Sequence, residues 1–215
     1  MQRAVESLRV HARAVLPFLF TAALFIARWQ RTGSTRLGFL VFNLVLAAIP
    51  LGLAIAASYA HRRQRNGIAI GLLAGCVLFL PNAPYVVTDL IHLRARPGAP
   101  FWFDIALFGS AAIAGVVLGV AALREARETL LVLFGPRVTF VLLGMATFAS
   151  GFGIYLGRFV RLNSWDAVLH PRAVLSDVLP TFIDPLAHSK AWMVTLVFGA
   201  LFTVAYLAAP RPADR

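Results

Sequence analysis

The stretch PNAPYVVTDLIHLRARPGAPFWFD, residues 81–104, interrupts an otherwise apolar part of the chain with polar side chains. Apolar runs flank it, residues 67–80 before it and 105–123 after it. Carboxylates and imidazoles are costly near hydrocarbon, so side chains of this kind mark either a site or a pairing between helices. The polar members of the stretch are Asn82, Tyr85, Asp89, His92 and Asp104.

Composition identifies lipid as the main surroundings of this chain. Of its 215 residues, 60% are hydrophobic and 13% are charged, whereas soluble domains carry about 25% charged residues. The formal net charge of +11 comes from arginines that cluster between apolar runs. Arginines in that position contact lipid phosphates and fix topology. We therefore expect the lipid bilayer as a partner, and no nucleic acid.

No motif indicates a cofactor or a metal. Cys76 is the only cysteine and lies within an apolar run, which excludes an intramolecular disulfide and leaves a cysteine-based metal cluster without partners. The sequence holds no glycine-rich phosphate loop, no H-E-x-x-H and no G-x-S-x-G motif. We expect no cofactor, no metal and no soluble catalytic domain.

Six segments are candidates to cross a bilayer, which takes about 20 mostly apolar residues. The third has too short an apolar run before Pro81, so it must continue through PNAPY as a kinked helix or break there and re-enter. We predict a single all-α membrane domain over residues 1–215, a polytopic transmembrane helix bundle of about six spans with the third span broken at Pro81–Pro84. The predicted spans are residues 10–29, 37–60, 67–93, 101–123, 138–159 and 191–209.

The connections between these spans are mostly short and charged. Residues 61–66 and 124–128 are typical of charged turns at a membrane surface. Residues 163–188 carry apolar side chains at helical spacing and indicate an amphipathic segment at the interface, broken near Pro180. With six spans, one side of the membrane holds 11 basic residues and the other nine. That margin leans to cytoplasmic termini, in what we expect to be a bacterial cell (inner) membrane.

Small residues recur at every fourth position in several spans, which lets helix backbones approach closely. The pattern predicts a compact bundle and leaves open whether it joins helices within one chain or in a homo-oligomer. The residues are Ala48, Gly52, Ala56 and Ala60; Gly67, Gly71 and Gly75; Gly115 and Gly119; and Gly153 and Gly157.

The polar stretch has an expected partner later in the chain. With the predicted number of spans, residues 81–100, the start of the fourth span and the end of the fifth lie on the same side of the membrane. The segment RFVRLNSWD, residues 158–166, can therefore meet the polar stretch. The candidate site drawn from both segments comprises Asn82, Tyr85, Asp89, His92, Asp104, Arg158, Arg161, Asn163, Trp165 and Asp166.

The charged pairs of this candidate site have both functional and structural interpretations. Asp89 and His92 are three residues apart and share a helix face, as a base with its orienting carboxylate, two metal ligands that lack a third, or a plain hydrogen bond. Asp104 belongs either to a site or to a salt bridge with Arg158 or Arg161 that locks two helices together. Those two arginines could grip a phosphate or carboxylate, or extend to lipid headgroups.

Asn82 and the NSWD segment have simpler interpretations. Asn82 is expected to satisfy the backbone that the prolines on either side leave unpaired. Asn163 or Ser164 can cap a helix start, with Asp166 near the positive end of that helix.

The motifs resemble those of a known family. PNAPY (81–85), TDLIHL (88–93), WFD (102–104) and RFVRLNSWD (158–166) resemble the bacterial family catalogued as domain of unknown function 1361. The resemblance runs from about the second span to the sixth. It implies a small multi-pass membrane protein and carries over no activity.

Three functions compete on this evidence. The polar cluster could bind or transport an ion, a proton or a small anionic solute, because irregular backbone at membrane depth is tolerated only against protein or a wet cavity. The chain could instead be a small membrane-embedded enzyme acting on a lipid or lipid-linked substrate, with Asp89 and His92 in acid–base roles. It could also be a structural or accessory membrane subunit. The lack of a recognisable catalytic motif leans against an enzyme.

Overall fold

The computed structural model describes residues 2–209, with side chains from residue 15 onward, and every regular element in that range is helical. The predicted all-α class is therefore confirmed. In chain order the elements are α1 (Gln2–Thr32), α2 (Gly38–Arg62), α3 (Asn66–Phe79), α4 (Asn82–Tyr85), η1 (Val86–His92), α5 (Phe101–Tyr155), η2 (Leu156–Val160), α6 (Asp166–Leu169), α7 (Pro171–Ile183) and α8 (Ser189–Ala208).

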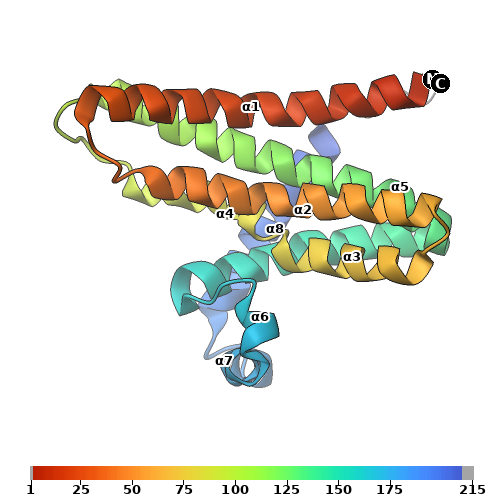
Figure 1. Ribbon diagram of the computed structural model, residues 1–215. Helices are drawn as coiled ribbons and strands as arrows, with labels where there is room; N and C mark the ends of the chain where they lie inside the picture. Colours follow the sequence, from red (N-terminus) through yellow and green to blue (C-terminus); the bar gives the residue numbers. More distant parts are fainter. Residues whose placement is uncertain (1, 210–215) are drawn as a thin grey trace.

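The long helix α5 is a hairpin with a single hinge residue. Gly135 has φ 76° and ψ 174°, which interrupts the helix, and this backbone region is essentially open to glycine alone. Pro136 follows, and proline suits the first position of a new helix because it lacks the N–H that would stay unpaired there. In Figure 1 the chain runs along α5 in one direction before this point and returns in the other after it.

The hinge corrects one sequence expectation. Residues 124–128 are helical and not a turn; the reversal comes at Gly135. Gly-Pro breaks a helix through its backbone, whereas arginines and glutamates are good helix formers. Charge alone was therefore the wrong signal for the turn.

Among the described residues, four stretches are long and apolar enough to cross a membrane: Gly38–Arg62, Asn66–His92, Phe101–Val160 and Ser189–Ala208. The third of them has 60 residues, about 90 Å if straight at 1.5 Å per residue, against a hydrocarbon core of about 30 Å. The hinge at Gly135 divides this stretch into two antiparallel arms, each much shorter than the whole. Six spans stay a prediction, which requires α1 and the two arms of α5 to cross separately.

The stretch Asn66–His92, which holds Pro81 and Pro84, stays helical through its prolines and changes helix type instead of re-entering. The α-helix ends at Phe79, the short α4 follows, and η1 continues as a tighter 3₁₀-helix. The amide nitrogen of Asn82 donates a hydrogen bond to the carbonyl oxygen of Phe79 at 2.9 Å. As the sequence predicts, this side chain satisfies backbone next to Pro81.

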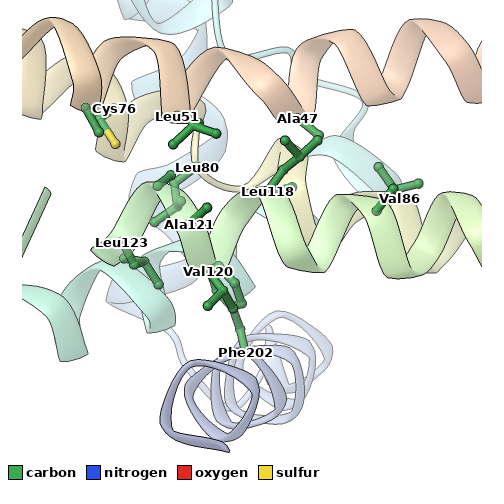
Figure 2. Close-up of a cluster of buried hydrophobic side chains, with 14 of the residues drawn as sticks. Ala47, Leu51, Cys76, Leu80, Val86, Leu118, Val120, Ala121, Leu123 and Phe202 are labelled. Atoms are coloured by element: carbon green, nitrogen blue, oxygen red, sulfur yellow. The ribbon is translucent and has the colours of Figure 1, made fainter. Parts of the chain in front are cut away.

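The hinge divides α5 into a first arm, residues 101–134, and a second arm, residues 136–155. The first arm lies at the centre of the bundle, where α5 packs against α1, α2, α4 and η1. Figure 2 shows side chains of α2, α3 and α8 gathered around it, with Phe202 of α8 next to Val120. Cys76 is buried in this core and is 2% exposed, in keeping with a small hydrophobic side chain.

The small residues of α5 pack within the chain. A Cβ added at Gly115 would lie 2.6 Å from the carbonyl oxygen of Ala83, and one at Gly119 would lie 2.8 Å from the Ala83 Cβ. A Cβ at Gly153 would overlap the ring of Pro81. By contrast, nothing lies within 4 Å of a Cβ at Gly67 or Gly71. Gly115, Gly119 and Gly153 therefore bring Pro81 and α4 close to both arms, whereas Gly67 and Gly71 have no such partner among the described residues.

The segment after α5 runs across the direction of the bundle helices and lies to one side of them (Figure 1). Figure 1 shows α7 nearly end-on below helices that run lengthwise across the view. Phe182 packs edge-on against Trp192 of α8, with ring centroids 5.2 Å apart, and 5.5 Å from Phe152 of α5. The expected break near Pro180 is wrong, since α7 continues to Ile183. A proline in the last turn removes only one hydrogen bond, which that turn tolerates.

Candidate functional site

The helix type of η1 aligns the polar residues of the TDLIHL motif. In a 3₁₀-helix, residues three apart stand directly above one another, so Asp89 and His92 share a face, as do Tyr85 and Thr88. The hydroxyl of Thr88 donates to the carbonyl oxygen of Tyr85 at 2.6 Å. That bond fixes the hydroxyl with its lone pairs free to accept a donor from another helix.

Arg158 supplies that donor from the end of α5. It lies in η2, a π-helical turn, a rare geometry that recurs at functional positions. Its Nε and Nη2 donate to the Thr88 hydroxyl at 3.0 and 2.6 Å, and Nη2 also donates to Asp89 Oδ1 at 2.7 Å. The guanidinium lies over the ring of Tyr85, 4.5 Å from its centroid. Residues 85–89 therefore supply four contacts to the guanidinium of Arg158.

The second carboxylate oxygen of Asp89 is also occupied. Asn43 of α2 donates to Oδ2 at 2.7 Å, and the Asp89 side chain is 2% exposed. Burial of a carboxylate is costly unless a cation and hydrogen bonds satisfy its oxygens. Asp89 has both, so it holds α2, η1 and the end of α5 together.

His92 forms the outer edge of this cluster. Its Nε2 lies 3.2 Å from Arg158 Nη1; arginine can only donate, so Nε2 is the acceptor of this hydrogen bond. The ring packs edge-on against Phe39 at 5.5 Å, yet the residue is exposed. An imidazole next to a guanidinium, open on one side, is suited to meeting a further polar group.

Arg158 itself retains hydrogen-bonding capacity. A guanidinium has five N–H groups, and Nη1 has His92 as its one partner in the described part of the chain. The side chain of Arg158 is 14% exposed, compared with 2% for Asp89. The outward-facing side of the cluster is therefore cationic.

Asp104 corrects the predicted pairing. It forms a two-bond ion pair with Arg28 of α1, at 2.5 and 3.2 Å, and not a salt bridge with Arg158 or Arg161. The pair is 3% and 0% exposed. Arg28 lies in α1, near the end of the first predicted span and outside the motifs, so no spacing within the motifs could identify it.

The remaining candidates lie at the margin of the cluster. Asn82 reaches Ser164, whose hydroxyl accepts from it at 3.0 Å. Asp166 folds back onto Asn163, accepting from its backbone N–H at 2.6 Å, so the acid closes the turn and the expected cap at Asn163 or Ser164 is wrong. Trp165 is half-buried.

Arg161 separates from Arg158. Its φ of 69° is left-handed and ends the helix, so the two arginines do not share a helical face as their spacing predicts. Arg161 is exposed and has no ion pair among the described residues. Within residues 15–209, no three His, Cys, Asp or Glu side chains lie close enough to hold a metal ion.

Sequence reasoning missed three members of these clusters: Arg28, Asn43 and Thr88. Asn43 carried a usable signal, because an amide within a long apolar span needs a partner. Thr88 precedes Asp89 in the motif and could have been added on that ground. Arg28 lies at the edge of the predicted first span, where an arginine can also reach lipid headgroups, so its position does not identify a protein partner.

Comparison with known proteins gives a family and no activity. A family model described as "Protein of unknown function (DUF1361)" matches residues 42–205, most of the chain. No curated protein and no solved structure matches the chain. The matched range contains Asn43, the TDLIHL motif and Arg158, and it excludes Arg28.

Proposed function

The chain belongs to the DUF1361 family of proteins of unknown function, and we propose that it is a multi-pass bacterial inner-membrane protein that binds or transports a small anionic solute. The binding residues in this proposal are Arg158 and His92, near one membrane face. The chain crosses six times with both termini in the cytoplasm. The ligand meets the exposed edge of His92 and the open N–H of Arg158 Nη1.

The observation that supports this proposal most is the incomplete burial of Arg158. Its positive charge is 14% exposed, whereas its partner Asp89 is 2% exposed. Thr88, Tyr85 and Asp89 hold the guanidinium on three sides. A fixed guanidinium is pre-organised to bind a carboxylate or an oxyanion, because little side-chain entropy is then lost on binding.

The second candidate is a structural role as an accessory membrane subunit. It rests on the full satisfaction of Asp89, whose two oxygens are taken by Arg158 and Asn43. Under this alternative the cluster holds three helices together and no ligand binds. The enzyme alternative has no observation of its own in its favour.

The two candidates differ in their response to added anions. The full-length chain in detergent is heated with sulfate, bicarbonate or acetate, against chloride at equal ionic strength. Ligand at one hundred times its Kd stabilises the native state by about 2.7 kcal/mol, so a binding anion raises the midpoint by several degrees. Arg158→Lys keeps the charge but loses the planar fork, and we expect it to abolish that shift.

Arg172→Lys is the matched control, since Arg172 is exposed and outside the cluster. It should respond to anions as the wild type does. If none of the three anions raises the wild-type midpoint above chloride, while Arg158→Lys destabilises the chain, the structural role is the correct one.

A further inference from the structure

The connection between η1 and α5, residues 93–100, is held firmly against the end of α1. Gly98 has φ 86°, and a Cβ there would lie 3.1 Å from Thr32 Cγ2, so the backbone passes close to that helix. Arg31 donates from Nε to the carbonyl oxygen of Gly98 at 3.2 Å. The side chains on this connection therefore project from a fixed frame.

Arg96 turns inward from that frame. Its Nη1 and Nη2 donate to the carbonyl oxygens of Arg94 and His92 at 3.2 and 2.8 Å. Its guanidinium carbon lies 5.8 Å from the centroid of the Phe108 ring. Three contacts thus fix a half-buried cation whose partners are carbonyls and a ring, none of them an anion.

The charges around Arg96 do not balance. Arg94, Arg28 and Arg36 are close enough to act on it electrostatically, and Asp104 is the acid that opposes them. Asp104 already forms the closed pair with Arg28. In the described part of the chain, Arg36, Arg94 and Arg96 have no ion-pair partner. Burial and the charge of Arg94 lower the pKa of Arg96, as repulsion in an unneutralised cluster does.

The position of this cluster relates it to the membrane surface. Phe101 and Trp102, directly after the connection, are 45% and 67% exposed. Exposed aromatics at the start of an apolar helix are typical of the headgroup level of a bilayer. Clusters of arginines at that depth between membrane helices bind anionic headgroups.

We propose that Arg36, Arg94 and Arg96 form a binding site for an anionic phosphate group, supplied by an anionic phospholipid headgroup or by free phosphate. Arg96 is the fixed element of this site, while Arg36 and Arg94 are exposed and free to close on the ligand. The site is separate from Arg158 and does not depend on the solute proposed there.

The test uses the purified full-length chain in detergent. Its thermal midpoint is followed during titration with short-chain phosphatidylglycerol, with zwitterionic phosphatidylcholine, or with inorganic phosphate. The variant is Arg36→Gln with Arg94→Gln, because neither side chain donates a hydrogen bond to another described residue and folding should survive. At about fivefold in affinity per arginine, half-saturation of this variant should need roughly thirtyfold more phosphatidylglycerol.

The matched control is Arg62→Gln with Arg65→Gln, which removes the same charge at the far end of α2. It should titrate within about twofold of the wild type, because the removed charges lie beyond the Debye length of about 8 Å. If both pairs weaken the response equally, or phosphatidylcholine acts as well as phosphatidylglycerol, the site does not exist as proposed. Stabilisation by inorganic phosphate would identify free phosphate as the source; stabilisation by phosphatidylglycerol alone would identify the lipid. Should the double variant fail to fold, Arg94→Gln by itself gives the same comparison, with an expected increase in the half-saturating concentration of about fivefold.

Discussion

Two ion pairs link helices near the free ends of the α5 hairpin, and they differ in their exposure to solvent. Arg28–Asp104 is called the closed pair below, and Arg158–Asp89 the open pair. Arg28 and Asp104 join α1 to the first arm of α5 at 3% and 0% exposure. Arg158 and Asp89 join the second arm to η1 at 14% and 2% exposure. Each pair has two charges and short bonds, but only the second includes an exposed histidine.

The difference separates holding helices together from presenting a charge. In the closed pair each charge neutralises the other, and water is excluded from both. In the open pair the acid is buried and the base is not, so the base still presents positive charge outward. The sequence places Asp89 and Asp104 in the same polar stretch, yet their surroundings give them different tasks.

Breaking the closed pair should have the largest effect on stability. Asp104→Asn leaves the Arg28 charge buried without a partner, and we expect a loss of about 3–5 kcal/mol in the free energy of unfolding. The measurement is denaturation in detergent, with Asp177→Asn as the control, since Asp177 is exposed. A loss no larger than that of the control would mean that this pair does not hold α1 in place.

Disturbing the frame of the open pair should have an intermediate effect. In Gly153→Ala the new methyl group overlaps the Pro81 ring, which forces the second arm away from α4, and overpacking typically costs about 1–3 kcal/mol. Gly144→Ala is the control on the same arm, where a Cβ meets nothing within 4 Å. That substitution should be neutral or stabilising, because alanine favours helix. Equal destabilisation by both would show that close packing at Pro81 is not the cause.

The smallest stability change is expected at the open edge itself. His92→Phe keeps a ring against Phe39 and removes the acceptor for Arg158, and an exposed position should change stability by about 0.5 kcal/mol or less. The anion-induced rise in thermal midpoint should nevertheless fall. His170→Phe, at another exposed histidine, should leave that rise intact. A full anion response in His92→Phe would remove His92 from the proposed solute site.

Local patterns and parity carry much of this architecture. The helical class follows from the apolar runs, and Asp89 meets Arg158 because an even number of reversals returns the chain to the same side. The strongest turn signal in this part of the sequence is Gly135-Pro136, whereas the charges at 124–128 suggest a turn where the chain is helical. Helix-breaking backbone chemistry decides such a question before charge does.

The pairing of Asp104 could not be predicted in the same way. Parity places nine basic residues on the same side as Asp104, and choosing among them needs the relative rotation of whole helices. The left-handed backbone at Arg161 removes one of them, and the π-helical turn directs Arg158 to Thr88 and Asp89. These are tertiary outcomes, which spacing along one helix does not report.

Gly135 is a hinge about which the two arms of α5 can rotate relative to each other. Both ion pairs lie near the free ends of the α5 hairpin, and its single hinge residue lies at the far end. From Gly135 to Arg158 the second arm measures about 35 Å at the usual helical rise. A rotation of about 5° at the hinge would move its tip by about 3 Å, the length of one hydrogen bond. The closed pair holds the first arm of α5 to α1, so a change in angle at Gly135 moves the second arm, whose end carries Arg158 next to His92.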